Sequence, residues 1–462
     1  MNGSEKGMLD PRDPKAFREA CHKALDVALD HVLSACERPV WTAVPHEVRA
    51  VLAEPAPRAG AGLERTVEEL TRLILPYPTG NTHPRFFGWV HGTGTASAVV
   101  PALFAAAMNV NCGGRDHAGT YVERAVLDWS KELLGFPRNA GGILVTGTSQ
   151  ANLLALAAAR EKAEGDQLVA YLSTEGHSSI AKALRLLGIR NEAIRRIPCD
   201  ADFRMDLAAL EAGIRQDRRR GLRPFCVIGS AGTVNTGAFD DLDAIATIAS
   251  TEGLWFHVDG ALGAWCALAP GLLEKVRGME KADSLAFDFH KWLHVEYACG
   301  CVLFRDAALQ RRAFQSEADY LAMEGRGLFG GHPWFHSLGS DLSRGFQALK
   351  VWFALKEHGA DAFRDAIARN CAQARALAAL VAAQLEFELL QEPPLNIVCF
   401  RYRGSDAANQ RIAERLHEEG IAALSLARLH GRTWLRACIT NHRTREEDLD
   451  ILVRALLSAA AE

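Results

Sequence analysis

Short apolar runs alternate with helical patterns between about residue 98 and residue 304, and this alternation limits the possible folds of the 462-residue chain more than any other feature. Strands buried on both faces read as nearly continuous apolar runs, whereas strands with one wet face alternate apolar and polar residues. The pattern therefore predicts an α/β fold, with a mostly parallel central sheet of the seven-stranded type and helices on both faces. The runs are GGILVTG, QLVAYLS, PFCVIGS, LWFHVDG, DSLAFDF and CGCVLFR.

The sequence changes character on either side of this region, and the length favours more than one domain. Helical spacing around the linker AEPAPRAGAG predicts an N-terminal helical segment over residues 1–80. We assign residues 81–340 to a large domain and residues 341–462 to a small α+β domain. In the small domain, LNIVCFRYR and WLRACIT read as antiparallel strands that flank the helix AANQRIAERLHEEG.

Composition excludes several classes of function. The net charge is 52 minus 56, or −4, and no long basic run is present, so no nucleic-acid partner is expected. The 11 cysteines are scattered without a CxxC motif, which indicates a reducing cytoplasm and no metal site. No apolar run reaches the roughly 18 to 20 residues of a membrane span, and the N-terminus lacks a signal-peptide core. We therefore expect a cytoplasmic protein without a membrane partner.

Polar residues with chemical potential follow the apolar runs directly. In open α/β sheets, ligands bind outside the carboxyl ends of the strands. Residues that end different strands of such a sheet therefore belong to one candidate site. They are Thr148 and Ser149, His177, Thr233, Asp259 and Lys291.

Thr148 and Ser149 come at the start of a helical pattern, SQANLLAL. A helix N-terminus offers free N–H groups and a positive dipole end to an anion such as phosphate, but an ordinary helix cap uses the same residue types. His177 is either a capping histidine or a ring that stacks on a planar cofactor. Thr233 either lines a ligand or belongs to an ordinary turn. Taken singly, each of these motifs leaves both alternatives open.

Asp259 and Lys291 are harder to explain as ordinary residues. Asp259 ends a strongly apolar run, where a carboxylate is costly without a cationic partner. Lys291 follows 32 residues later in DFHKWL, between Phe289 and Trp292, although lysine is rarely buried. Pyridoxal 5′-phosphate (PLP) requires a lysine for a Schiff base and a carboxylate that keeps its pyridine nitrogen protonated. The motifs together predict a PLP site, and the apolar neighbours predict a lowered pKa for Lys291.

With these motifs, the chain resembles the PLP-dependent group II decarboxylases of fold type I, especially the aromatic L-amino acid decarboxylases. The resemblance covers roughly residues 80–440 and rests on HPRFFGW, TGTSQANLLAL, EGHSSIAKA, HVDGALGAW, DFHKWL and LSRGFQALKVWFALKEHG. It implies conversion of an aromatic or related L-amino acid to an amine and CO2. It also implies a homodimer with active sites at the subunit interface and an exchanged N-terminal helical segment.

The resemblance assigns roles to individual residues. It implies that Lys291 forms the Schiff base and that Asp259 pairs with the pyridinium nitrogen. His177 is the implied stacking histidine, placed to assist protonation of the substrate Cα. The other implied cofactor contacts, to the phosphate or near the ring, are Thr148, Ser149, Thr233, Asp288 and His290.

Two segments depart from the family pattern. Relatives carry a loop tyrosine that supplies the Cα proton, but the matching segment EGRGLFGGHPWFHSLGSDL has none, and Trp334, Phe335 or His336 falls near that place. Relatives with phenylalanine there form aldehydes. The segment NVNCGGRDHAG is polar where relatives have an apolar side-chain pocket. The expected substrate contacts are His91, Asn109, Asn111, Trp334 and Phe335.

Four rival functions differ in how well the sequence supports them. An oxidative PLP enzyme that forms an aldehyde would use the same scaffold. An aminotransferase or carbon–sulfur lyase is less favoured, because no arginine for the substrate carboxylate is evident. A nicotinamide dehydrogenase, prompted by HGTGTAS, lacks a clear βαβ context and leaves Lys291 unexplained. A non-catalytic binding protein would not need the set of lysine, aspartate and histidine.

Overall fold

A seven-stranded sheet forms the centre of the computed structural model, which describes residues 9–163, 165–315 and 325–461. The strand order is β1-β7-β6-β5-β4-β2-β3. Neighbouring strands are parallel except where β7 pairs with β1 and β6. The strands are β1 (Gly141–Val145), β2 (Leu168–Ser173), β3 (Ile194–Ile197), β4 (Arg223–Ser230), β5 (Trp255–Asp259), β6 (Ser284–Asp288) and β7 (Gly300–Phe304).

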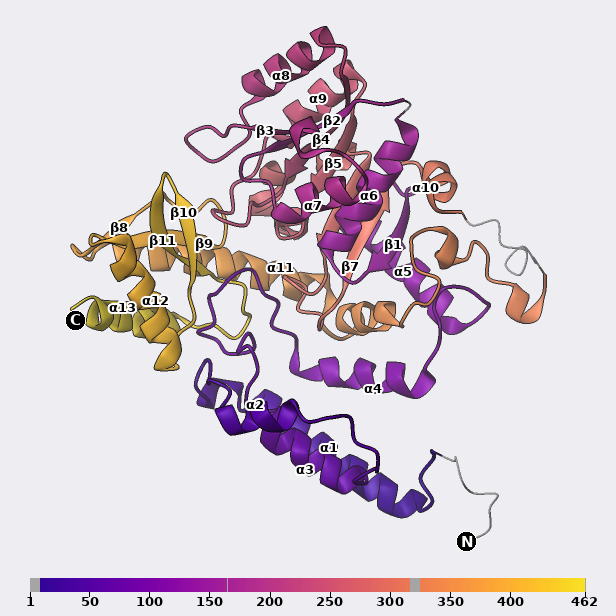
Figure 1. The fold of residues 1–462 in the computed structure, drawn as a ribbon, viewed down its shortest axis with the longest axis vertical. Helices are drawn as coiled ribbons and strands as arrows, with labels where there is room; N and C mark the ends of the chain where they lie inside the picture. Colours follow the sequence, from indigo (N-terminus) through magenta and orange to yellow (C-terminus); the bar gives the residue numbers. More distant parts are fainter. Residues whose placement is uncertain (1–8, 164, 316–324, 462) are drawn as a thin grey trace.

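Helices cover both faces of this sheet, so the predicted α/β class is confirmed (Figure 1). α6 and α7 pack on one face, and α8 and α9 pack on the other. The carboxylates of Asp206 and Asp241 accept hydrogen bonds from backbone N–H groups in the first turns of α8 and α9, which explains where these helices begin. The helices of this part are α5 (Ala118–Leu133), α6 (Thr148–Lys162), α7 (Ser178–Leu186), α8 (Leu207–Arg219), α9 (Leu242–Glu252) and α10 (Ala307–Phe314).

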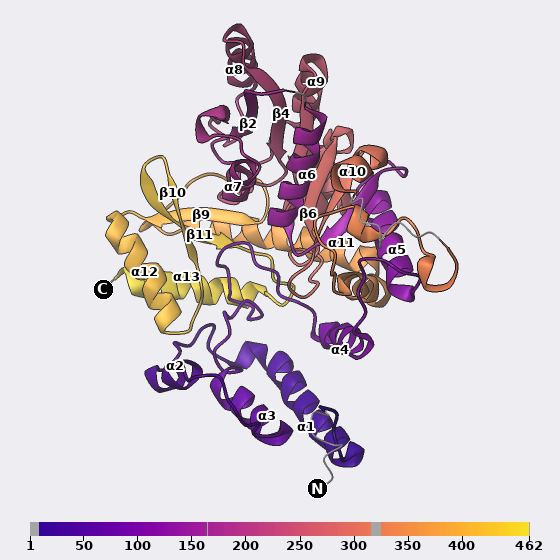
Figure 2. The ribbon, with the colours of Figure 1, turned by 45° about the vertical axis from the view of Figure 1, so that its right-hand side comes forward.

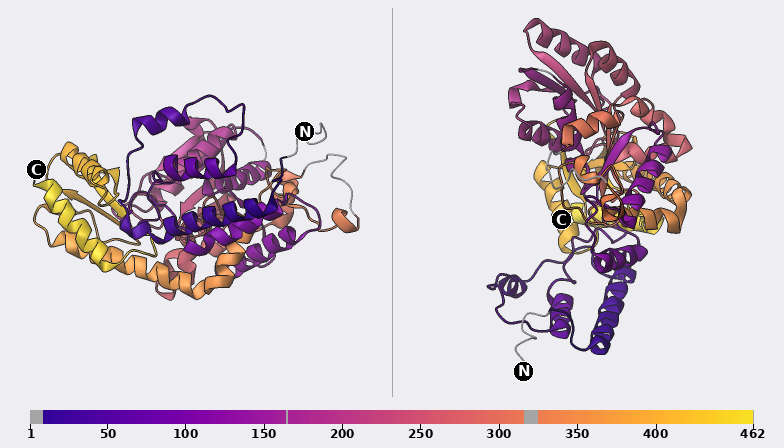
Figure 3. Two further views of the ribbon diagram at one scale, coloured as in Figure 1. Left: turned by 90° about the horizontal axis from the view of Figure 1, so that it is seen from below. Right: turned by 90° about the vertical axis from the view of Figure 1, so that its right-hand side faces the viewer.

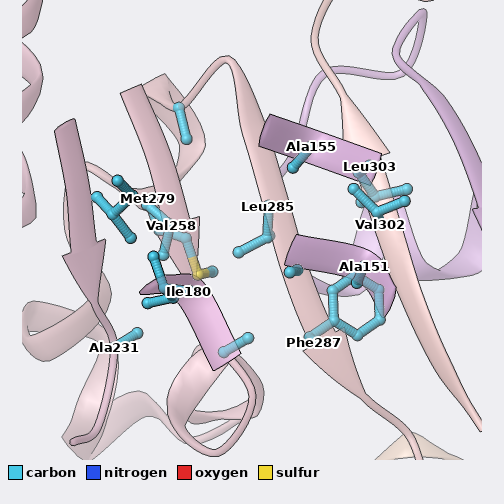
Figure 4. Close-up of a cluster of buried hydrophobic side chains, with 14 of the residues drawn as sticks. Ala151, Ala155, Ile180, Ala231, Val258, Met279, Leu285, Phe287, Val302 and Leu303 are labelled. Atoms are coloured by element: carbon cyan, nitrogen blue, oxygen red, sulfur yellow. The ribbon is translucent and has the colours of Figure 1, made fainter. Parts of the chain in front are cut away.

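The core lies between the sheet and these helices (Figure 4). Ala151 and Ala155 present the small side chains of α6 to the sheet, where Leu285, Phe287 and Val302 are fully buried. Small residues on the helix let its backbone approach the strands closely. Such packing is close to crystalline density, so it holds the ends of the strands in fixed positions.

A smaller antiparallel sheet, in the order β10-β11-β9-β8, forms a second layer with α12 and α13 at the C-terminus (Figure 2). α11 runs between the two sheets and contributes Cys371 to the large core and Leu377 to the small one. Gly359, with φ 74°, interrupts its helical geometry. These elements are α11 (Gln347–Ala382), β8 (Phe387–Leu389), β9 (Ile397–Tyr402), α12 (Asp406–Glu418), β10 (Ser425–Leu429), β11 (Arg432–Cys438) and α13 (Glu446–Ala460).

The N-terminal helices lie at one end of the molecule, away from both sheets (Figure 3). Asp13 caps the first of them by accepting from two backbone N–H groups. Large apolar side chains on these helices are exposed, including Leu70 at 47% and Phe104 at 63%. The helices are α1 (Pro14–Leu33), α2 (His46–Leu52), α3 (Leu63–Leu73) and α4 (Val99–Met108). The boundaries at residues 80 and 340 stay predictions.

Among the described helices, none is long and apolar enough to cross a membrane. The cysteines are free thiols, and most of them are buried. The expected cytoplasmic location stays a prediction.

Candidate active site

The carboxyl ends of β1, β2, β4, β5 and β6 meet around a cavity of about 530 Å³. Asp259 and Asp288 are the last residues of β5 and β6, and His177 directly precedes α7. The fold thus places residues that are far apart in the sequence at one edge of the sheet, as expected for an open α/β sheet. The lining includes all eight predicted cofactor contacts, Thr148, Ser149, His177, Thr233, Asp259, Asp288, His290 and Lys291.

Lys291 lies in the turn after β6, and its Nζ is 3.1 Å from Asp288 Oδ2. The neighbouring Phe289 and Trp292 are fully buried, as the sequence suggested. The predicted lowering of the Lys291 pKa is nevertheless wrong. Burial alone lowers this pKa, but the carboxylates of Asp288 and Asp259 outweigh it and raise the pKa above its usual value. Phe289 packs on Trp265 and Phe287, and Trp292 donates to Asn370, so the apolar neighbours in the sequence do not determine the charge environment of the amine.

Asp259 is buried and receives one donor on each carboxylate oxygen. Ala261 N lies 3.1 Å from Oδ1, and Asn152 Nδ2 lies 3.1 Å from Oδ2. Asn152 is on α6, four residues after Thr148, so it lies on the same side of that helix. Two neutral donors orient the carboxylate without neutralising its negative charge. A cationic group in the cavity would therefore be stabilised beside it.

A buried hydrogen-bond network lies behind Asp259. His257 Nε2 donates to Asn152 Oδ1 over 2.9 Å, and His257 Nδ1 accepts from Ser284 Oγ at 2.8 Å. Trp255 Nε1 donates to the same Ser284 Oγ. Burial lowers the pKa of His257 to about 4, although Asp259 raises it in part. His257 is therefore neutral at pH 7, with its proton on Nε2. This network fixes which way the Asn152 amide faces.

His177 is the N-cap of α7 and lines the cavity at its exposed edge. Its Nδ1 accepts from Ser179 N at 3.3 Å and lies 2.7 Å from Ser179 Oγ. Ser179 Oγ in turn accepts from Asn152 Nδ2 at 3.3 Å. Because Nδ1 accepts, the neutral ring carries its proton on Nε2. Asn152 thus links the positions of His177 and Asp259.

The start of α6 fits an anion. Its N-cap is Gly147, which has no side chain of its own to cap the helix, and the buried Thr148 Oγ1 has no hydrogen-bond partner within the ranges that the structure describes. Thr148 N already donates to Asp288 Oδ1 at 2.7 Å. The unpartnered hydroxyl and the N-terminus of the helix fit the phosphate of PLP. Asp259 fits its pyridine nitrogen and Lys291 its aldehyde carbon, so the cavity as a whole suits this cofactor.

Aromatic side chains line one wall of the cavity. The rings of Trp89 and His91 stack with centroids 5.8 Å apart, and His91 meets Tyr297 edge-on at 6.1 Å. Tyr297 Oη accepts from Gly92 N at 3.0 Å, and its ring centroid is 4.3 Å from that of His290. Burial, supported by the positive charge of Lys291, lowers the pKa of His290.

Four predicted substrate contacts lie outside the cavity of this chain: Asn109, Asn111, Trp334 and Phe335. The Asn111 carboxamide bonds backbone groups of its own loop and of Arg344 instead. Trp334 is buried, donates to Gly330 O and stacks under the guanidinium of Arg115. Phe335 is also buried. Of the five residues, His91 alone lines the cavity, and the other four do not line it in this chain.

Several site residues were not identified from the sequence. His257 lies two residues before Asp259, so strand periodicity places both on one face of β5. Asn152 lies within the quoted motif TGTSQANLLAL at helical spacing from Thr148. These two spacings could have identified His257 and Asn152 as site residues from the sequence. Tyr297 had no such signal, because it follows an irregular turn.

A lysine, an aspartate and a histidine around one cavity at this edge of the sheet define a PLP-dependent enzyme of fold type I. The chain matches the family model "Pyridoxal-dependent decarboxylase conserved domain" over residues 45–403 and therefore belongs to this family of amino acid decarboxylases. The predicted fold type, cofactor and enzyme class are confirmed.

Individual relatives support the same assignment. The chain is 32% identical over 465 residues to an aromatic-L-amino-acid decarboxylase of Bacillus atrophaeus, covering 96% of each chain. The crystal structure of Oryza sativa TDC with PLP and tryptamine is similar with a TM-score of 0.91 at 27% identity, covering 98% of this chain and 99% of that one. Rhodiola rosea 4-hydroxyphenylacetaldehyde synthase is similar with a TM-score of 0.89 at 25% identity, over the same shares.

Proposed function

We propose that this decarboxylase converts an aromatic or related L-amino acid to its amine and CO2, with Lys291 as the residue that binds PLP covalently. The observation that carries this proposal is the placement of Lys291, Asp259 and His177 on one cavity beside an aromatic wall. When bound, PLP serves as an electron sink for the electrons left at Cα after CO2 departs.

The residues of the chain divide the remaining tasks. Asp259, oriented by Asn152, stabilises a proton on the pyridine nitrogen of the cofactor. Lys291 carries a proton on Nζ because the carboxylates of Asp288 and Asp259 raise its pKa, and the ion pair with Asp288 at 3.1 Å holds the amine in place in the cavity. His177 presents a protonated Nε2 at the open edge of the cavity, where a proton can be passed to the substrate Cα.

The aromatic wall supports a planar substrate side chain. Trp89, His91 and Tyr297 present ring faces and edges, and rings prefer offset or edge-on contacts with other rings. Val90 and Leu262 add apolar surface to the same cavity. Indole, phenol and imidazole side chains all match such a wall, and this is why the proposal extends to related amino acids.

A panel of L-amino acids tests this proposal. The PLP-loaded enzyme is incubated with tryptophan, tyrosine, phenylalanine, histidine and glutamate, and CO2 and amine are measured together. We expect stoichiometric amine and CO2 from at least one aromatic amino acid and neither from glutamate. Lys291→Ala should abolish turnover and the borohydride-reducible visible absorption. Preference for glutamate over every ring-bearing amino acid would contradict the proposed substrate class.

Oxidative decarboxylation is the second candidate. Two observations favour it: the sequence has no tyrosine between residues 321 and 401, and one similar structure is a 4-hydroxyphenylacetaldehyde synthase. In that reaction the amino acid, O2 and water give the aldehyde, CO2, ammonia and hydrogen peroxide. The same panel distinguishes the two outcomes when peroxide and ammonia are also measured. Amine without peroxide excludes the oxidative reaction.

We further propose that the active enzyme is a homodimer with active sites at the interface. Exposed apolar side chains on the N-terminal helices, among them Leu63, Leu70, Leu103 and Phe104, form surface that monomers rarely leave uncovered. A second chain could also bring the loops with Asn111 and Phe335 to the cavity. Light scattering should give twice the chain mass, and Phe104→Glu should produce monomers with little activity. A fully active monomer would contradict this arrangement.

A further inference from the structure

A second cavity, of about 600 Å³, lies between α11, the loop before α13 and the turn that follows α1. Arg369 of α11 lines it, together with Arg443 and Arg445 of the loop. The one carboxylate among its described lining residues is that of Glu446. Three guanidinium groups against one carboxylate leave two net positive charges, and we call this feature the arginine cavity.

The three arginines of the arginine cavity differ in burial: Arg443 is half-buried, whereas Arg369 and Arg445 are exposed. Within the described ranges, none of the three forms an ion pair, and Arg443 Nη1 is buried without a hydrogen-bond partner. Arg369 Nη2 donates to the backbone oxygen of His442 at 2.8 Å. Burial lowers the pKa of Arg443, yet a guanidinium stays charged at neutral pH. A partly buried cation without a counter-charge is unfavourable unless a ligand supplies one.

Nearby side chains do not supply this counter-charge. Asp448 pairs with Arg85 at 3.2 Å and accepts from Arg445 N at 2.9 Å, so its carboxylate is engaged. His442 contributes no charge of either sign, because burial and the neighbouring Arg443 lower its pKa to about 3. The charge of the cavity is therefore left to solvent or to a bound anion.

We propose that the arginine cavity binds a phosphate-type oxyanion, either inorganic phosphate or the phosphate of a small phosphomonoester. Guanidinium groups present paired N–H donors that match the oxygens of phosphate, and a dianion would balance the two net charges. The cavity is larger than one phosphate requires, so a small organic group attached to the phosphate also fits.

The arginine cavity adjoins the active site through a short chain of contacts. His442 Nδ1 lies 3.1 Å from Thr93 Oγ1, and Thr93 follows Gly92, whose N–H donates to Tyr297 Oη. A bound anion therefore stabilises the segment that carries His91 into the active-site cavity. Since Cys36, from the turn after α1, also lines the arginine cavity, the anion also ties the N-terminal helices to the body of the protein.

Calorimetric titration of the PLP-loaded enzyme with inorganic phosphate tests the proposal, because the cofactor then already fills the phosphate site at α6. A parallel titration with glycerol 3-phosphate distinguishes free phosphate from a phosphomonoester. We expect one site per chain, and a thermal midpoint that rises with ligand concentration. Arg443→Gln and Arg369→Gln should each weaken binding about tenfold or more, because each removes charge-assisted hydrogen bonds.

Two further variants sharpen the test. Glu446→Gln should tighten binding, since it removes the negative charge from the cavity, whereas Arg219→Gln at an exposed position of α8 should leave it unchanged. If Arg443→Gln fails to fold, Arg445→Gln replaces it. Absence of binding up to about 10 mM of either probe, or equal affinity in Arg443→Gln and the unmodified enzyme, would overturn the proposal.

Discussion

Asn152 on α6 holds Asp259 on β5 through a hydrogen bond of 3.1 Å from its side-chain nitrogen to Asp259 Oδ2. The second hydrogen of the same nitrogen goes to Ser179 Oγ, which contacts the ring of His177. His257 is neutral at pH 7, and its Nε2 donates to Asn152 Oδ1, which fixes the orientation of the amide. One amide thus orients both the carboxylate for the cofactor nitrogen and the histidine that faces the substrate.

Replacement of Asn152 by Ala should therefore impair catalysis without removing a group that contacts substrate. We expect kcat to fall on the order of tenfold or more, because partners that orient functional groups have effects of this size. PLP should also dissociate more readily, and its absorption should titrate at a different pH, since Asp259 loses a donor. Glu161→Ala, at an exposed position of the same helix, is the matched control. An unchanged kcat together with an unchanged pH titration would show that Asn152 is only a packing residue.

Sequence patterns predict the parts of this site that depend on contacts between residues close together in the chain, but not the parts that depend on tertiary contacts. The strand ends and their polar residues follow from local periodicity, so the cavity with Thr148, His177 and Asp259 could be predicted. The short strands β3, β8 and β10 were missed, because IRRI, FEL and SLARL carry charges or are too short to show a pattern. These strands form because the longer strands next to them present unpaired backbone N–H and C=O groups.

The pKa of Lys291 shows what local patterns cannot supply. Its sequence neighbours are apolar rings, which favour a neutral amine. The sign of the shift depends instead on Asp288, three residues earlier, whose carboxylate reaches Nζ at 3.1 Å through an irregular turn. Turn geometry of this kind is decided by the tertiary packing around it.

Stability should fall in mild acid because of buried histidines. An unfolded histidine titrates near pH 6.5, whereas burial lowers the pKa of His257 to about 4 in the folded chain. Between these values the unfolded chain binds more protons, so stability rises with pH and is lost as pH falls from 6.5 to 4. His257 contributes up to about 1.4 kcal/mol per pH unit in this window. Asp240 opposes the trend, because burial raises its pKa to about 6.

Denaturant unfolding measured at several pH values checks this expectation. His257→Gln keeps hydrogen-bonding capacity but cannot titrate, so it should reduce the slope of stability against pH by about one proton. His46→Gln, at an exposed position in α2, should leave the slope unchanged. Equal slopes for His257→Gln and the unmodified protein would mean that His257 does not titrate differently on folding.

Gly92 should tolerate no side chain. A Cβ at this position would lie 1.4 Å from the backbone oxygen of His290, the residue before Lys291. Gly92→Ala must therefore push apart the segment with His91 and the turn that carries Lys291, at a cost of about 3 kcal/mol or more. Loss of bound PLP absorbance and a lower thermal midpoint are the expected results. Gly271→Ala, where no atom lies within 4 Å of the added Cβ, should match the unmodified protein.

Removing one partner of the buried ion pair between Arg344 and Glu123 should strongly destabilise the folded protein. Its closest atoms are 2.5 Å apart, and both side chains are at most 6% exposed. Arg344 also donates to the backbone oxygens of Cys112 and Leu144. These hydrogen bonds join the loop between α4 and α5 to β1. Glu123→Gln leaves a buried guanidinium without its counter-charge, so we expect a loss of about 3–5 kcal/mol in the free energy of unfolding.

The exposed pair Arg65–Glu69 on α3 provides the comparison, with side chains 59% and 43% exposed. Glu69→Gln should cost less than about 1 kcal/mol, because solvent screens the charges. The double variant Glu123→Leu with Arg344→Met should be less destabilised than the sum of its single changes, since it leaves no buried charge unpaired. Denaturant unfolding of all variants measures these differences. If Glu123→Gln lowers the free energy of unfolding no more than Glu69→Gln does, the Arg344–Glu123 pair does not stabilise the contact between β1 and the loop that joins α4 to α5.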